Sequence, residues 1–145
     1  MLKYCINKWE ENRGKLKKAI QELDGYISYT ELMKLVVKHI FGDEWDEKEI
    51  TAIDNGDYQG TIIFAFHKKT YQPYASQYLM TYISYGSCSL CDALEAAFFE
   101  NESEEETVLD LMNICLHLIQ NVHHPFKTDY FNDRELDEEA SDIEW

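Results

Sequence analysis

An Asn-Gly pair at residues 55 and 56 separates two segments in which apolar and polar residues alternate. The preceding segment reads EITAID and the following one reads DYQGTIIFAFHKK. Asn and Gly adopt the positive φ angles of a two-residue hairpin turn more easily than other residues, so this pair is the strongest short-range signal for a β-hairpin. The sequence therefore predicts two antiparallel strands, over 49–54 and 57–69.

A third alternating segment, QYLMTYISY at 77–85, follows a loop that contains Pro73. Its length and its content of tyrosine and β-branched residues are typical of a strand. Because the connections between the three segments are short, we expect them to pair in order as an antiparallel meander.

Four segments with helical periodicity flank the predicted strands. Two precede them: NKWEENRGKLKKAIQELDG, and LMKLVVKHIF, which the capping-box sequence SYTE at 28–31 opens and Gly42 ends. Two follow them: one after Gly86, and one with apolar residues at helical spacing over 108–122, separated by an acidic loop at 100–106. The predicted fold is α+β, with two N-terminal helices, a three-stranded antiparallel meander, and two C-terminal helices packed on one face of the sheet.

Length and composition favour a single core. The chain has 145 residues, of which 45% are hydrophobic, and this is sufficient for one α+β domain over 1–126. Residues 127–145 carry eight acids, two bases and scattered aromatic residues, which predicts an acidic tail. No apolar run approaches the roughly 18 residues of a membrane span, and the N-terminal residues lack the apolar stretch of a signal peptide. We therefore expect a cytoplasmic protein, in which the four cysteines are thiols or metal ligands.

The net charge of −15 is distributed unevenly. Residues 1–40 contain eight Lys/Arg and five Asp/Glu, a balance of +3, whereas residues 41–145 contain five and twenty-three, a balance of −18. Most of the chain would therefore repel the phosphates of nucleic acid. A partner with a basic surface is the interpretation we favour, with plain solubility as the alternative explanation of the charge.

Two cysteines, Cys88 and Cys91, have the spacing of half a zinc site or of a redox dithiol. Cys88 is expected in the first turn of a helix, where backbone N–H groups stabilise a thiolate, although the adjacent Asp92 acts in the opposite direction. His117 is a candidate third ligand for zinc. Because a second CxxC pair is missing, we favour small buried packing residues over a metal site or thiol chemistry.

Five tyrosines are concentrated in the loop before the third strand and in that strand. They are Tyr71, Tyr74, Tyr78, Tyr82 and Tyr85. Since half of the side chains of a strand point outward, several of these rings are candidates for a binding surface. The alternative is that they fill one face of the sheet and expose only their hydroxyl groups.

The segments IDNGDYQGTIIF, YQP, YISYGSCSLCDAL and LHLIQN resemble, in this order, a group of small and largely uncharacterised proteins encoded in bacteriophage genomes. The resemblance covers roughly residues 50–121. The shared positions are Asp57, Tyr58, Gln59, Gly60, Tyr85, Gly86, Ser87, Cys88, Ser89, Cys91, Asp92 and His117. Leu90 replaces the usual glycine of the turn. The resemblance implies a phage origin but no established activity.

The shared positions form either one site or one folding nucleus, and we favour the nucleus. If they form a site, the candidate binding residues are Asp57, Tyr58, Gln59, Tyr82, Tyr85, Ser87 and Asp92. The candidate zinc ligands are Cys88, Cys91 and His117.

The sequence favours a non-enzymatic, phage-encoded accessory protein that needs no cofactor. It would bind and inhibit a host macromolecule with a basic surface, such as a nucleic-acid-binding immune effector, in the manner of anti-CRISPR proteins and DNA mimics. One alternative is a sponge that sequesters a nucleotide signal at the helix start after Gly86. Another is a thiol- or zinc-dependent protein that uses Cys88 and Cys91.

Overall fold

The computed structural model describes residues 1–56, 60–86 and 92–125. In chain order the elements are α1 (Leu2–Gln21), α2 (Tyr29–Val36), the π-helical turn η1 (Val37–Phe41), β1 (Thr51–Asp54), β2 (Gly60–His67), the 3-10 turn η2 (Ala75–Gln77), β3 (Tyr78–Tyr85), α3 (Ala93–Phe99) and α4 (Glu104–Gln120). The α+β class with a three-stranded antiparallel sheet is confirmed. The acidic tail predicted at 127–145 lies outside the described residues.

The three strands pair in the order β1-β2-β3, and both pairings are antiparallel. The register places Ile53 opposite Ile63, and Ile63 opposite Tyr82. The meander is therefore confirmed, but the first connection is longer than a two-residue turn, because β1 ends at Asp54 and β2 begins at Gly60. Asn55 takes part in closing this loop, since its side-chain Oδ1 accepts a hydrogen bond from the Thr61 N–H at 2.8 Å.

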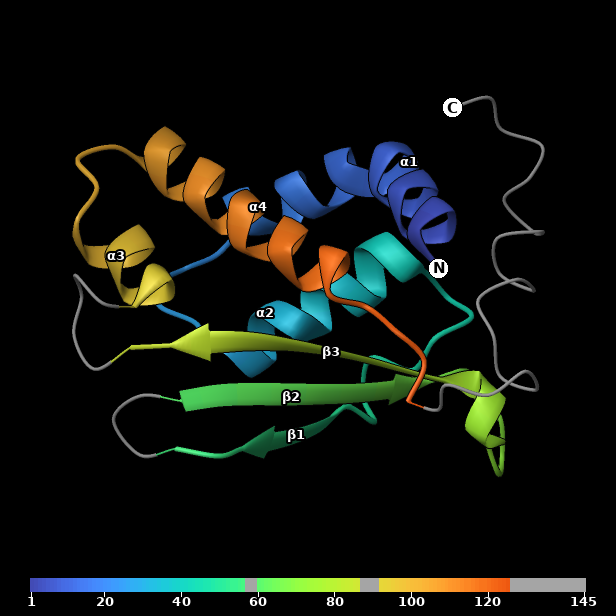
Figure 1. Ribbon diagram of the computed structural model, residues 1–145. Coiled ribbons are helices and arrows are strands. Elements are labelled where there is room, and N and C mark those ends of the chain that lie inside the picture. Colours follow the sequence, from blue (N-terminus) through green and yellow to red (C-terminus); the bar gives the residue numbers. More distant parts are fainter. Residues whose placement is uncertain (57–59, 87–91, 126–145) are drawn as a thin grey trace.

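The helices lie together on one side of the sheet, with β3 nearest to them and β1 farthest away (Figure 1). The strand residues that face the helices are the buried ones: Phe64 and Phe66 on β2, and Leu79 and Thr81 on β3. Thr81 is satisfied by a hydrogen bond from its Oγ1 to the Leu118 carbonyl oxygen of α4, at 2.5 Å. Because a buried hydroxyl without a partner is costly, this bond fixes how α4 sits on β3.

A cluster of aromatic side chains packs between the sheet and the helical segments α1 and η1. The ring centroids of Phe41 and Phe66 lie 5.1 Å apart, and those of Trp45 and Phe66 lie 5.4 Å apart. The indole N–H of Trp45 donates to the Tyr4 hydroxyl oxygen at 3.0 Å, so the polar edge of this large ring is paired in the core.

The second helical segment ends as a π-helical turn, which periodicity alone does not predict. The Gly42 N–H donates to the Val37 carbonyl oxygen at 3.0 Å, a bond one residue longer than in an α-helix. Gly42 itself has φ = 90°, a conformation in which L-residues are strained. The Asn12 side chain of α1 donates to the Ile40 carbonyl oxygen at 3.0 Å and satisfies one of the terminal carbonyls of this turn.

Helix α4 begins inside the acidic run that was predicted to be a loop at 100–106. That prediction is wrong for Glu104–Glu106, which form the first turn of the helix. The side chain of Ser103 caps the helix by accepting from the Glu106 N–H at 3.2 Å, and carboxylates in a first turn interact favourably with the helix dipole.

Across the part of the chain that the structure describes, no helix is both long and apolar enough to cross a membrane.

Candidate functional site

The segments around Gly60 and Tyr85 meet at one end of the sheet. Gly60 of β2 pairs directly with Tyr85 of β3. The Tyr85 hydroxyl lies 2.5 Å from both Asp54 Oδ1 and the Gly56 carbonyl oxygen, so it donates its proton at the hairpin turn. A Cβ atom on Gly60 would lie 2.9 Å from Asn55 Oδ1 and 3.0 Å from the Gly56 Cα. The close approach of the turn therefore leaves no room for a side chain at Gly60. The hydroxyl group of Tyr85 joins β3 to the turn.

Asp92 is the buried polar centre where α2, α3 and the end of β3 meet. Its Oδ1 atom accepts from the Tyr29 hydroxyl at 2.7 Å and from the Leu94 N–H at 2.9 Å, and its Oδ2 atom accepts from the Gly86 N–H at 3.1 Å. The Glu95 N–H adds a further bond to Oδ1 at 3.2 Å. Asp92 thus caps α3 and joins it to two other segments, which gives this candidate binding residue a structural role.

Most of the other predicted site residues lie outside the described residues. These are Asp57, Tyr58, Gln59, Ser87, Cys88 and Cys91. The proposed helix-start anion site after Gly86 includes residues of the same undescribed range. The predictions of a CxxC zinc site, of a reactive thiol and of packed cysteines therefore all stay predictions.

The histidine proposed as a distant zinc ligand, His117, is exposed on α4. Among the residues that the structure describes, no three or more His, Cys, Asp or Glu side chains gather in an arrangement that could hold a metal ion. Cys115, close to His117 in sequence, is buried on α4, and burial raises the pKa of its thiol. A buried thiol with a raised pKa is a poor nucleophile and metal ligand at neutral pH.

Tyr82 follows the buried Thr81 on β3, so its side chain points to the opposite face of the sheet, away from the helices. Its side chain is 44% exposed, beside Ile63 and the exposed Ile53 across the strands. Tyr71 and Tyr74 in the preceding loop are also exposed. The outer face thus offers the kind of tyrosine-containing surface that the sequence suggested, although nothing in its contacts identifies an occupant.

A second exposed aromatic group lies where α3 meets the start of α2. The ring of Tyr26 stacks on Phe99 with centroids 5.7 Å apart and planes 14° apart, and it contacts Phe98 at 5.2 Å. Tyr26 is 53% exposed and Phe99 is 65% exposed. Two large rings are therefore packed together and more than half exposed, and exposed apolar groups of this kind are typical of interaction sites.

Three carboxylates interact electrostatically with one ring of this aromatic pair, Tyr26. Burial, and then the charges of Asp92, Glu95 and Glu31, raise the pKa of Tyr26, so these three acids interact electrostatically with its hydroxyl. We call the rings Tyr26, Phe98 and Phe99 together with Glu31 and Glu95 the acidic aromatic surface.

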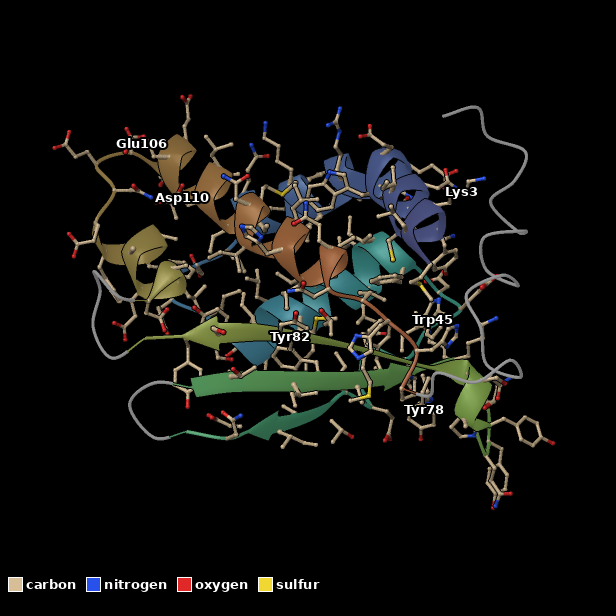
Figure 2. All side chains as sticks on the ribbon, in the orientation of Figure 1. Lys3, Trp45, Tyr78, Tyr82, Glu106 and Asp110 are labelled. Carbon is tan, nitrogen blue, oxygen red and sulfur yellow. The ribbon has the colours of Figure 1, made fainter. Side chains whose placement is uncertain are left out.

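More acids follow directly along the chain, and all but Asp110, which is half-buried, are exposed. They are Glu100, Glu102, Glu104, Glu105, Glu106 and Asp110. Figure 2 shows Glu106 and Asp110 at one end of the helical layer and Lys3 at the other. The chain contains no Lys or Arg between Lys69 and Lys127, so nothing within this stretch of sequence neutralises the acidic end.

Sequence reasoning found the charge of this end but missed its aromatic pair. Nothing in the periodicity singled out Phe99, and Tyr26 lies in a distant segment between two predicted helices. The available signal was the Phe98-Phe99 pair on a short amphipathic helix, since one helical face cannot bury two adjacent residues equally.

No protein-family model matches the chain, and neither curated proteins nor solved structures give a significant match. The functional assignment therefore depends on the geometry and charge of the described residues.

Proposed function

We propose that this protein is a non-catalytic binding protein whose acidic aromatic surface holds basic side chains of a partner. The observation that carries the proposal is the exposed Tyr26–Phe99 stack beside Glu31 and Glu95. An aromatic face attracts a guanidinium or ammonium group, and adjacent carboxylates accept its hydrogen bonds. Exposed rings that become buried on binding are also the side chains that contribute most at protein interfaces.

The acids of the α3–α4 connection extend this surface and give it long-range attraction for a basic partner. The connection keeps a defined shape, because the Asn101 side chain donates to the Ala97 carbonyl oxygen at 3.1 Å and to Asp110 Oδ2 at 2.7 Å. A negative field of this kind raises the association rate with a positively charged protein and decreases with salt.

The partner we propose is a host protein that uses a basic surface to bind nucleic acid. This follows from the phage resemblance of the sequence and from the charge of −18 over residues 41–145. An immune nuclease is the natural candidate, and occupation of its nucleic-acid channel would inhibit it by charge mimicry. No cofactor is needed for such a function.

The direct test measures binding to an arginine-rich peptide by fluorescence anisotropy at low salt. We expect Phe99→Ala to weaken binding about tenfold, or about 1.4 kcal/mol, through loss of the exposed ring. The matched control is Ile53→Ala, which removes a similarly exposed apolar side chain from the outer face of the sheet and should leave the affinity unchanged.

Two variants that remove the same number of charges distinguish the contribution of this surface to binding from that of the total charge. Glu95→Gln/Glu100→Gln should weaken binding more than Glu10→Gln/Glu11→Gln on α1, although both variants remove two charges. Equal effects would mean that only the total charge attracts the peptide and would overturn the assigned surface. Capture from host lysate that about 0.5 M salt does not weaken would contradict an electrostatic partner altogether.

A further inference from the structure

A groove with a volume of about 250 Å³ runs between the N-terminal half of α1 and the C-terminal half of α4. Its walls are mainly apolar and include Leu2, Ile6 and Trp9 of α1 together with Leu116 and Ile119 of α4. Leu2 is 67% exposed and Ile6 is 38% exposed. Apolar side chains at the rim of an apolar groove are characteristic of a surface that binds a peptide segment.

The groove is lined by one charged residue, Glu10, and basic residues lie on either side of it along α1. Lys3, Ile6, Glu10, Arg13 and Lys17 follow one another at spacings of three and four residues, so they form one stripe along the helix. Lys3, Arg13 and Lys17 are all exposed. Helix α1 carries six Lys/Arg and two Glu, in a chain whose net charge is −15. The groove therefore has a mainly apolar floor, and Lys3, Arg13 and Lys17 form a basic edge on α1 that is interrupted by Glu10, whose carboxylate lies 3.8 Å from the Arg13 guanidinium.

The residues after α4 have a composition that complements the apolar groove and the basic residues of α1. Gln120 at the end of α4 lines the groove, and the described chain continues only to residue 125. Residues 126–145 contain eight acids and two bases. They also contain six large apolar or aromatic side chains: Phe126, Tyr130, Phe131, Leu136, Ile143 and Trp145. Residues 121–125 lead from α4 to the sheet, where His123 pairs with Met80 of β3, so this segment begins six residues after Gln120. It carries acidic groups that complement the basic residues of α1 and apolar groups that the groove would accept.

We propose that residues 126–145 of the same chain dock in the α1–α4 groove, with apolar side chains on its floor and carboxylates along the Lys3–Arg13–Lys17 edge. The 20 residues span about 30 Å as a helix and more when extended, which is enough to follow α1 along its length. Covalent attachment a few residues away gives a millimolar effective concentration, so even a weak contact is occupied.

Hydrogen exchange measured by mass spectrometry on the full chain at low salt tests this docking. We expect amides of 126–145 to exchange about tenfold or more slower than an unstructured segment. The variant Lys3→Glu/Arg13→Glu/Lys17→Glu should abolish that protection. The control Lys15→Glu/Lys18→Glu/Lys34→Glu changes the charge equally at exposed positions outside this stripe, and should keep the protection.

Three results would overturn the proposal. The first is unprotected exchange of 126–145 in the unmodified chain. The second is equal loss of protection in both triple variants. The third is protection that falls on dilution, which would assign the groove to the segment of a second copy. The amides of β2 and β3 report whether each variant is folded.

A salt titration and an apolar variant add measurements that do not depend on the charge-reversal variants. Protection of 126–145 should decrease from low salt to about 0.5 M salt, and Leu2→Asp/Ile6→Asp should abolish it. Because this experiment does not involve the acidic aromatic surface, its failure would not affect the proposed function. Conversely, failure of the peptide-binding experiment would not affect the proposed docking.

Discussion

At the scale of single residues, the contact between Tyr29 and Asp92 joins a helix that precedes the sheet in sequence to one that follows it. The Tyr29 hydroxyl donates to Asp92 Oδ1 at 2.7 Å and accepts from the Leu94 N–H at 3.2 Å. Tyr29→Phe leaves the buried carboxylate without its side-chain donor, so we expect a loss of about 1.5 to 3 kcal/mol in the free energy of unfolding. Urea unfolding at neutral pH measures it. Tyr26→Phe is the control, and it should change stability by less than about 0.5 kcal/mol because its ring is largely exposed.

The same contact predicts how stability depends on pH in alkaline solution. Burial, and then the hydrogen bond to Asp92, raise the pKa of Tyr29 in the folded protein. Above about pH 10 the unfolded chain releases this proton while the folded chain keeps it, so the free energy of unfolding falls as the pH rises. The buried Cys115 acts with the same sign from about pH 8.5. We therefore expect the stability of the original protein to fall more steeply above pH 10 than that of Tyr29→Phe, and parallel curves would contradict this.

Two glycines should respond to alanine in opposite directions. Gly60→Ala places a Cβ atom 2.9 Å from Asn55 Oδ1 and 3.0 Å from the Gly56 Cα, which should cost about 1 to 3 kcal/mol. Gly14 lies in the middle of α1, and a Cβ atom added there would meet nothing within 4 Å, so Gly14→Ala should stabilise the protein by about 0.5 to 1 kcal/mol. Thermal unfolding of both variants checks the pair, and a change of the same sign in both would contradict the prediction.

At the scale of elements, the N-terminal cap of α4 sets the residue at which the acidic connection ends and the helix begins. Ser103 accepts from the Glu106 N–H, and Ser103→Ala should destabilise the protein by about 1 kcal/mol. Ser84, which is exposed on β3, provides the control, since Ser84→Ala removes a hydroxyl that caps no helix. If both substitutions have the same small effect in urea unfolding, Ser103 does not hold the start of α4.

Local sequence patterns predicted the elements well and their contacts poorly. Alternation and helical spacing predicted the three strands and the helical segments, because burial of one face imposes those periods on the sequence. The capping role of Asp92 and the stacking of Tyr26 on Phe99 join segments distant in sequence, and no local period encodes such a contact. The π-helical turn before Gly42 was also missed, and its contacts with Asn12 of α1 and Phe66 of β2 likewise join segments distant in sequence.

At the scale of the whole molecule, the acids of the α3–α4 connection lie at one end of the helical layer, and Lys3, near the start of the basic helix α1, lies at the other (Figure 2). Glu22 and Glu100 are both exposed and both occupy the position that ends a helix, of α1 and α3 respectively. A cation at a helix C-terminus is favourable in either place. The surroundings differ, because Lys18 lies in the last turn of α1, whereas the charged residues that flank Glu100 in sequence are all acids.

Glu100→Lys should therefore stabilise the protein by about 0.5 to 1 kcal/mol more than Glu22→Lys. The difference should vanish at about 0.5 M salt, where exposed charges are screened, and urea unfolding at low and high salt measures it. Equal effects at low salt would mean that the acidic end creates no local field. If the field exists, Glu100→Lys should also weaken binding of the arginine-rich peptide. A substitution that increases stability while decreasing binding is expected where like charges have been kept together for recognition rather than for folding.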